Sequence, residues 1–552
     1  MKSKIEVILN QVAKELCEAQ GASLPGGFDY NLHPPKESQH GDLATNVAFK
    51  LSKILRKKPS EIAETIVTHI EKKGKDSPVD RMDIAGGGFI NFHLKKADLG
   101  AVIVNIHKAD KRYGRSEFGK GKKVIVEFVS ANPTGPLTIA HGRQAAVGDA
   151  LVRILKATGH EVHPEYYLND AGRQMELLGK SVWARYNELL GMAVPFPEDG
   201  YKGEYIRDIA RAIIEKEKKD NLLKEPEDKA VEFCRNYAVK ILMGEIESDL
   251  AKMRVHFDNY FSEKSLYAKR AVEHALDVLN KKGYLYESEG ALWFRSTDFG
   301  DDKDRVVRKS TGEYTYLTPD MAYHLAKYER GFGLMVNLWG PDHHGYIPRL
   351  KAACQALGYP PEAIHIGIVQ LTTLYREGQP VRMSTRAGEF VTLRELYEDV
   401  GVDATRFFFT MRRQESPLDF DLDLAKAQSQ ENPVYYLQYA HARIASLLKF
   451  ADQKVTEKAD VGLLAAAEEI ELIRTLSEFP DMLIAASRAF EPYRLADYLR
   501  QVAACFHKFY SAHRIVIEDK ELSMARLLLS DATRIVLRNG LEFLGISQPE
   551  SM

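Results

Sequence analysis

Residues 122–167 read KKVIVEFVSANPTGPLTIAHGRQAAVGDALVRILKATGHEVHPEYY and place a strand, a loop, a helix and a second strand in immediate succession. The run 124–129 is too apolar for a half-exposed strand and too short for a helix, which predicts a buried parallel strand. From Ile139 the apolar residues recur at helical spacing, with Thr138 as the expected N-cap and Gly159 as the stop signal. Such a unit crosses over right-handed and points the amino end of its helix into a crevice that favours phosphate.

A later stretch repeats this organisation. Residues 334–359 read LMVNLWGPDHHGYIPRLKAACQALGY, where a strand breaks at Gly340 and a helix begins near Tyr346. The segment from Gly340 to His344 should therefore face the same crevice. Its adjacent histidines lack a third ligand at metal-site spacing, so no structural zinc is expected. Residues 364–374, IHIGIVQLTTL, predict one further strand.

Length and composition limit the class of protein. The 552 residues suffice for three or four domains. Lysine and arginine number 76 against 78 acidic residues, so the net charge gives no global sign of a polyanionic partner. The cysteines are scattered singly, and we find neither a secretory leader nor a long apolar run. These features predict a cytoplasmic enzyme without a membrane segment.

The residues around the helix start carry a family resemblance. A histidine and a glycine at such a position occur in many α/β folds, but the flanks VEFVSANPTGPL and HGRQAAVGDAL resemble the arginyl-tRNA synthetases. In class I aminoacyl-tRNA synthetases a His-Ile-Gly-His tetrad binds ATP. Here the tetrad reads Thr138, Ile139, Ala140, His141, so only His141 carries over directly. The resemblance implies a ligase that joins L-arginine to tRNA(Arg), with ATP as substrate and Mg²⁺ as its companion ion.

A second motif also resembles the family. The segment RMSTR, residues 382–386, stands where class I enzymes carry Lys-Met-Ser-Lys-Ser. A cation there stabilises the departing pyrophosphate, and Arg382 or Arg386 is expected to supply it, with Arg143 or magnesium as other sources. The resemblance implies these catalytic residues: His141, Arg382, Ser384 and Arg386. It implies these ATP-binding residues: Pro133, Thr138, Ala140, His141, Gly142, Asp342, His343 and Met383.

The choice of arginine requires an acidic pocket, because a guanidinium is best bound by carboxylates in a fork. The family's arginine contacts match these residues here: Glu127, Ser130, Asn132, Tyr316 and Asp320. An alternative interpretation is that Asp320 only caps the helix that follows Pro319.

The rest of the chain divides into further regions. Residues 1–110 resemble the α+β domain that contacts the tRNA elbow in arginyl-tRNA synthetases, although the basic run 53–58 also fits a solvated helix face. The catalytic region is expected over 111–430, with a mostly helical connecting insertion at about 168–290. The pattern of residues 431–552 predicts an all-α bundle, which resembles the anticodon-binding domain of arginyl-tRNA synthetases. Its tyrosine stripe fits the core better than a base-stacking surface. It comprises Tyr435, Tyr436 and Tyr439.

The predicted fold is therefore α/β. It consists of a Rossmann-like parallel sheet of the class I synthetase type with an inserted helical segment, a small α+β N-terminal domain and an all-α C-terminal bundle. Two alternative functions remain at this point: a class I synthetase for a different amino acid, or a nucleotide-binding protein that binds RNA without charging it. A monomer is expected.

Overall fold

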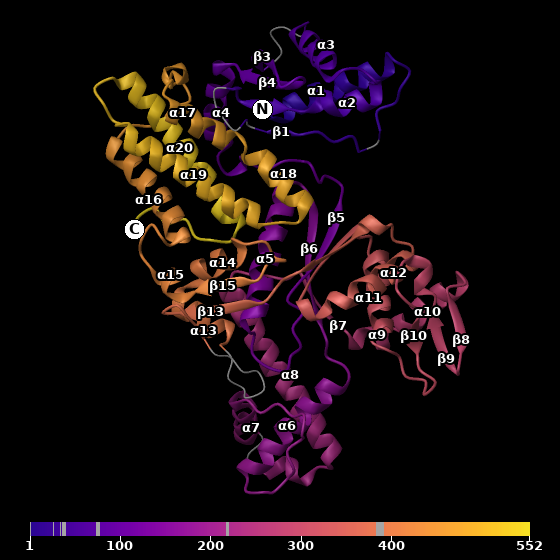
Figure 1. Cartoon of the computed structure of the whole chain (residues 1–552). Coiled ribbons are helices and arrows are strands. Elements are labelled where there is room, and N and C mark those ends of the chain that lie inside the picture. The colour runs from indigo at the N-terminus through magenta and orange to yellow at the C-terminus, as the bar shows by residue number, and fades with distance from the viewer. Residues whose placement is uncertain are drawn as a thin grey trace.

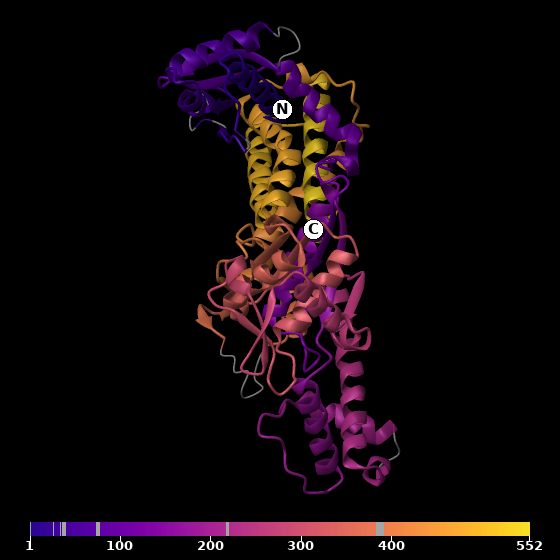
Figure 2. The ribbon, with the colours of Figure 1, turned by 90° about the vertical axis from the view of Figure 1, so that its right-hand side faces the viewer.

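The computed structural model describes residues 2–25, 27–33, 35, 40–72, 78–216, 220–381 and 391–552. The molecule is elongated, with the N-terminal domain at one end and the helical insertion at the other (Figures 1 and 2). The central parallel sheet lies between these two ends, and a C-terminal helical bundle packs beside it.

The central sheet has five strands in the order β12-β11-β5-β6-β7, and every neighbouring pair is parallel. Its strands are β5 (Lys123–Glu127), β6 (Glu161–Leu168), β7 (Asn259–Ser262), β11 (Leu334–Trp339) and β12 (Ile364–Ile368). Helix α5 (Ile139–Ala157) connects β5 to β6, with Thr138 as its N-cap, as predicted. Gly159 follows the helix with φ 92°, a conformation that favours glycine.

The strand order reverses direction between β5 and β11. From β5 the chain crosses through α5 to β6 on one side, and from β11 it crosses through α12 (Ile347–Leu357) to β12 on the other. A crevice therefore opens beyond the carboxyl ends of β5 and β11, which is where ligands bind in open α/β sheets. The two predicted strand ends do meet at this crevice.

The single strand predicted over 364–374 is wrong, because the structure divides this run. After β12 the chain turns and enters β13 (Thr372–Arg376), which belongs to a separate sheet of order β14-β13-β15. Strands β14 and β15 span Gln379–Pro380 and Leu418–Asp421. The carbonyl groups of Gln370 and Leu371, at the turn, accept hydrogen bonds from Arg143. These bonds lie where the chain leaves the main sheet.

Two insertions interrupt the chain between β6 and β11. Helices α6 (Arg173–Leu189), α7 (Glu204–Lys216) and α8 (Glu227–Lys252) form an arm between β6 and β7 (Figure 2). Between β7 and α11 (Leu317–Glu329) lie α9 (Lys264–Ala268), α10 (Ala271–Lys281) and an antiparallel sheet of β8 (Leu285–Ser288), β9 (Ala291–Phe294) and β10 (Arg305–Arg308). Strand β7 thus returns to the central sheet inside the range predicted to be mostly helical.

The N-terminal domain has its own hydrophobic core. A four-stranded antiparallel sheet packs with three helices, in the strand order β1-β2-β4-β3. The strands are β1 (Leu32–His33), β2 (Leu43–Thr45), β3 (Val79–Ala85) and β4 (Phe89–Leu94), and the helices are α1 (Lys2–Glu18), α2 (Val47–Leu55) and α3 (Pro59–Lys72). Helix α4 (Lys96–Ala109) then packs against the bundle.

The C-terminal bundle packs against α5, which connects two strands of the central sheet. Helices α13 (Leu393–Val400), α14 (Val402–Thr410) and α15 (Leu422–Lys426) precede it. The bundle comprises α16 (Pro433–Ala451), α17 (Ala467–Ser477), α18 (Phe479–Ala489), α19 (Tyr493–Ala512) and α20 (Lys520–Phe543). The tyrosine stripe on α16 is half-buried rather than part of the core, and the Tyr435 and Tyr439 rings stack 6.0 Å apart.

Candidate active site

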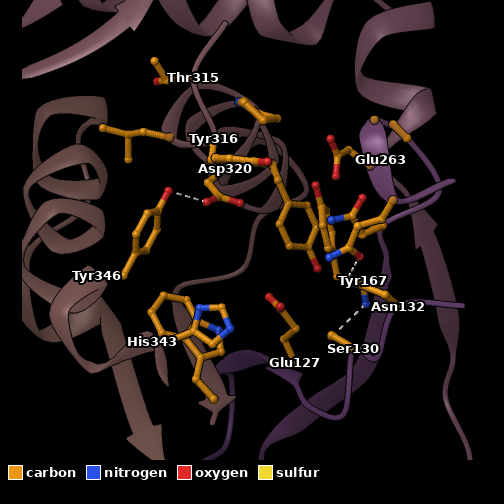
Figure 3. Close-up of a pocket in the computed structure, with 18 of the residues that line it drawn as sticks. Glu127, Ser130, Asn132, Tyr167, Glu263, Thr315, Tyr316, Asp320, His343 and Tyr346 are labelled. Carbon is orange, nitrogen blue, oxygen red and sulfur yellow. Dashed lines mark hydrogen bonds between the residues drawn. The ribbon is translucent and has the colours of Figure 1, made fainter. Parts of the chain in front are cut away.

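A cavity of about 1400 Å³ occupies the crevice beyond β5 and β11. Its walls come from the ends of β5, β6 and β7, the first turn of α11 and the loop after β11 (Figure 3). Most of the side chains predicted to bind arginine or ATP line this cavity: Glu127, Ser130, Asn132, His141, Tyr316, Asp320, Asp342 and His343.

The remaining predicted residues fall into two groups. Four are described but are not among the residues that line this cavity: Pro133, Thr138, Ala140 and Gly142. Gly142 packs against the neighbouring helix, since a Cβ on it would lie 2.5 Å from Leu393 Cδ1. The other four, of the second motif, lie outside the described residues: Arg382, Met383, Ser384 and Arg386.

The described residues that follow the second motif lie beside the start of α5. The backbone N–H of Leu393 donates to the carbonyl of Leu137 over 2.8 Å, and Thr392 forms a bridge with Thr138. The described chain that resumes at Val391 therefore contacts the residues that begin the first motif.

His141 is oriented by the N-cap of its own helix. The backbone N–H of Thr138 donates to His141 Nδ1 over 3.2 Å, so Nε2 carries the proton in the neutral ring. Burial lowers the pKa of His141 to about 4, although nearby Asp342 opposes this shift. At neutral pH His141 is therefore an uncharged N–H donor at the cavity wall.

The loop that follows β5 is strained and bound to the helical insertion. Val129 and Ser130 have positive φ values of 66° and 40°, which are rare for residues with a Cβ and common at functional sites. The Asn132 amide donates to Gln174 Oε1 over 2.6 Å, and the Tyr205 hydroxyl donates to the carbonyl of Thr134 over 2.7 Å. Helices α6 and α7 thereby fix the loop conformation.

Glu127 already has a cationic partner. Lys327 Nζ, on α11, donates to Glu127 Oε2 over 2.5 Å, and both side chains are buried. Asn337 Oδ1 also accepts from Lys327 over 3.3 Å. The negative charge of Glu127 is thus compensated within the protein.

Asp320 lies in the same cavity but is bound by a neutral group. The Tyr346 hydroxyl donates to Asp320 Oδ2 over 2.5 Å (Figure 3). Burial raises the pKa of Asp320 to about 7, and the charges of Glu127 and Glu263 contribute to this shift. The alternative in which Asp320 caps its helix is wrong, because the N-cap of α11 is Tyr316 and the helix begins at Leu317.

Glu263 is a cavity carboxylate that the sequence interpretation missed. It directly follows β7 and lines the cavity, where the Tyr267 hydroxyl donates to it over 3.4 Å. Burial raises the pKa of the Glu263 carboxyl group. The available signal was its place directly after the short run NYFS, as Asn132 and Gly340 follow other strands.

Three residues form the outer part of the cavity. Tyr316 is 85% exposed at the rim above Asp320. Asp342 and His343 are also exposed, and their side chains lie 3.4 Å apart. This rim is open to solvent, unlike the floor that Glu127 and Asp320 form.

Arg143 does not reach the cavity. Its guanidinium is fully buried, and among the described residues it donates only to backbone carbonyl groups. The suggestion that Arg143 supplies the cation for pyrophosphate is therefore wrong.

Within the described ranges, no group of three histidine, cysteine or acidic side chains could hold a metal ion. None of the helices described is both long and apolar enough to cross a membrane.

Three family models together match most of the chain. They are the arginyl tRNA synthetase N terminal domain over residues 3–94, the class I (R) tRNA synthetase catalytic domain over 102–415 and the DALR anticodon binding domain over 437–552. With the parallel sheet and the cavity at its switch point, these matches define a class I aminoacyl-tRNA synthetase.

Individual relatives narrow this class. The arginine–tRNA ligases of Thioalkalivibrio sulfidiphilus and Geobacillus kaustophilus are 45% and 46% identical, and the matches cover 100% of this chain and 100% and 99% of theirs. The putative arginyl tRNA synthetase structure from Campylobacter jejuni has a TM-score of 0.77 and 34% identity, over 83% of this chain and 100% of that one. The Thermus thermophilus arginyl-tRNA synthetase shares the fold, with a TM-score of 0.79 at 22% identity over 100% of both chains.

The chain belongs to the arginyl-tRNA synthetases. It is therefore a ligase that charges tRNA with arginine and uses ATP as a substrate. This confirms the family that the motifs around His141 predicted, and it excludes the two alternative functions.

Proposed function

We propose that Asp320 and Glu263 bind the guanidinium of arginine. The observation that carries this assignment is the distribution of charge in the cavity. Neither carboxylate forms an ion pair with any residue that the structure describes, whereas Glu127 is paired with Lys327. A planar guanidinium would supply the positive charge and the charged N–H donors that neither carboxylate receives from the described residues.

The other cavity residues complete the arginine site. Glu127 Oε1 remains as an acceptor beside this fork, because Lys327 bonds to Oε2. Ser130 and Asn132, at the end of β5, contact the amino-acid end of the substrate, which must lie near His141 to react. Tyr316 closes the rim over the bound side chain. The arginine side chain is therefore recognised deep in the cavity, and the carboxylate of arginine reacts at the end of the cavity next to β5.

ATP is bound at the amino end of α5, where the helix dipole favours phosphate. The neutral His141 donates a hydrogen bond from its Nε2–H group to a phosphate oxygen as negative charge develops there. The family motifs support ATP contacts by these further residues: Pro133, Thr138, Ala140, Gly142, Asp342, His343 and Met383. They also support roles for Arg382, Ser384 and Arg386 in stabilising the departing pyrophosphate.

Magnesium accompanies ATP in this assignment. Mg²⁺ binds mainly through phosphate oxygens, water and one or two carboxylates. Asp342 fits this requirement, because its carboxylate is exposed at the rim and close enough to His141 to influence its pKa. When bound, the ion neutralises phosphate charge.

The reaction proceeds in two displacements. A carboxylate oxygen of arginine attacks the α-phosphorus of ATP, and the bond to pyrophosphate breaks as arginyl-adenylate forms. A terminal ribose hydroxyl of tRNA(Arg) then attacks the carbonyl carbon, loses its proton, and AMP leaves. Both steps need the α-phosphate beside His141 and the arginine carbonyl at the end of β5.

We assign the remaining regions from the same family. Residues 1–110 bind the tRNA elbow, 111–430 catalyse the reaction with the insertion at about 168–290, and 431–552 bind the anticodon. The protein acts as a monomer in the cytoplasm. Light scattering at working concentration tests the monomer assignment.

Arginine-dependent pyrophosphate exchange tests the guanidinium site. Asp320→Asn and Glu263→Gln should each weaken arginine use by about 2 to 5 kcal/mol, because a buried guanidinium loses a charged partner. Glu313→Gln is the matched control, since Glu313 lines the same cavity but is exposed and pairs with Lys309. Parent-like exchange by both test variants would refute the assignment.

A further inference from the structure

Arg143 is joined to two separate backbone segments by its guanidinium. It lies two residues after His141 on α5 and is fully buried. Nη1 donates to the carbonyl groups of Gln370 and Leu371 over 2.9 and 3.3 Å. Nη2 donates to those of Arg413 and Ser416 over 3.0 and 2.9 Å. One side chain thus bridges two turns that lie far apart in the sequence.

The electrostatic setting of Arg143 is unusual. Within the described ranges, the other buried cations have carboxylate partners: Arg406 pairs with Asp149, and Lys327 with Glu127. Arg143 forms no such pair there, and burial lowers its pKa to about 10, so it stays charged at neutral pH. A buried cation without a counterion costs stability that an apolar side chain of similar size would avoid. Compared with an apolar side chain, the guanidinium adds a rigid fork of N–H donors that can bind two backbone segments at once.

The two turns support the small sheet beside α5. Gln370 and Leu371 lie immediately before β13, and Arg413 and Ser416 lie between α14 and β15. Strands β13 and β15 pair in parallel, so Arg143 anchors both at their entry. Strand β14 follows β13 and ends at Pro380, two residues before Arg382 in the sequence.

The same turn also reaches the C-terminal bundle. Arg413 Nε donates to the hydroxyl of Tyr493, at the start of α19, over 3.0 Å. A continuous set of contacts therefore runs from the bundle, through the Arg413 backbone, to α5.

We propose that Arg143 is a positioning residue for ATP activation: it fixes the amino end of α5, and His141 with it, against the β14-β13-β15 sheet and the bundle. This inference rests on the proposed ATP site at α5. The two carboxylates proposed to bind the substrate arginine lie elsewhere, with Asp320 on α11 and Glu263 after β7. Neither contacts Arg143 in the described structure. Loss of Arg143 should therefore lower kcat/KM for ATP without weakening the binding of arginine.

The test measures two quantities for Arg143→Lys: kcat/KM for ATP in pyrophosphate exchange, and the dissociation constant for arginine. A lysine keeps the charge, but its single ammonium group cannot span both turns. A misplacement of about 1 Å at the reacting groups can cost about a hundredfold in rate, so kcat/KM for ATP should fall by about that factor. The dissociation constant for arginine should stay within about twofold of the parent value.

Two further variants separate positioning from general stability. Tyr493→Phe removes the contact on the far side of the Arg413 turn and should lower kcat/KM for ATP in the same direction, but less. Ser487→Ala removes a buried hydrogen bond at the opposite end of α5, where Thr158 Oγ1 donates to Ser487 Oγ over 3.0 Å. Ser487→Ala should lower the melting temperature and leave both kcat/KM for ATP and the dissociation constant for arginine at their parent values.

The outcomes are distinct. A folded Arg143→Lys enzyme with a parent-like kcat/KM for ATP overturns the proposal, and so does one whose dissociation constant for arginine rises by as large a factor as kcat/KM for ATP falls. His141→Ala is measured in parallel: if it activates arginine at the parent rate, the ATP site itself is misplaced and the positioning role fails with it. If His141→Ala is slow while Arg143→Lys is normal, only the positioning role fails.

Discussion

The Tyr346 hydroxyl donates a 2.5 Å hydrogen bond to Asp320, and the donor is neutral. This bond favours the charged carboxylate, whereas burial favours the protonated form and raises the pKa of Asp320 to about 7. Tyr346→Phe should raise this pKa further and increase KM for arginine at pH 7. The difference from the parent should shrink at pH 9, where Asp320 is ionised in both proteins. An equal defect at both pH values would contradict this role of Tyr346.

The pKa of Asp320 also predicts how arginine binding depends on pH. The charged groups that influence this carboxylate are Glu127, Glu263 and Lys327, and Tyr346 donates to it. Because its pKa is raised to about 7, Asp320 becomes protonated as the pH falls through that value, and KM for arginine should rise. Steady-state exchange from pH 5.5 to 9 measures this. In Asp320→Asn the arginine KM should lose this dependence, and a profile that keeps its inflection would assign it to another group.

His141 should contribute to the chemical step without titrating near neutrality. Its pKa is lowered to about 4, so it remains a neutral donor over the working range. His141→Ala should reduce the rate of adenylate formation by about a hundredfold to a thousandfold, as expected for the loss of one preorganised donor. Single-turnover measurements at pH 6 and 8 should give the same factor. A defect confined to low pH would indicate that the imidazolium is the active form.

Lys327 should be required for stability. Lys327→Met leaves Glu127 buried without its counterion, which costs about 3 to 5 kcal/mol when a buried pair is broken. Denaturant unfolding measures the loss, and Lys327→Met combined with Glu127→Gln should recover part of it. If the double variant is as unstable as the single one, packing rather than charge explains the effect.

Local sequence signals predicted the elements that depend on neighbouring residues. The apolar run before Glu127, the cap at Thr138 and the stop at Gly159 each lie beside the feature they specify. The position of the crevice was also predictable, because ligand sites in open α/β sheets lie beyond the carboxyl ends of the strands, and the strand that ends before Gly340 meets β5 there.

Contacts between distant residues explain what the sequence did not predict. At the break in 364–374 the carbonyl of Gln370 accepts a hydrogen bond from Arg143, more than two hundred residues earlier in the chain. The role of Glu263 depends on β7 pairing with β6 across the helical insertion. The ion pair of Glu127 with Lys327 joins residues that lie 200 positions apart in the chain, so the sequence did not show that this cavity carboxylate is compensated within the protein. Helical or strand periodicity contains no information about such pairs.

Asp320 and Glu263 are proposed to recognise the positive charge of arginine. Calorimetric binding of arginine and of citrulline, its neutral isostere, to the parent, Asp320→Asn and Glu263→Gln tests this proposal most directly. The parent should bind arginine much more tightly than citrulline, and each variant should lose most of that preference while its melting temperature stays at or above the parent value. Variants that keep the full preference for arginine would contradict the claim.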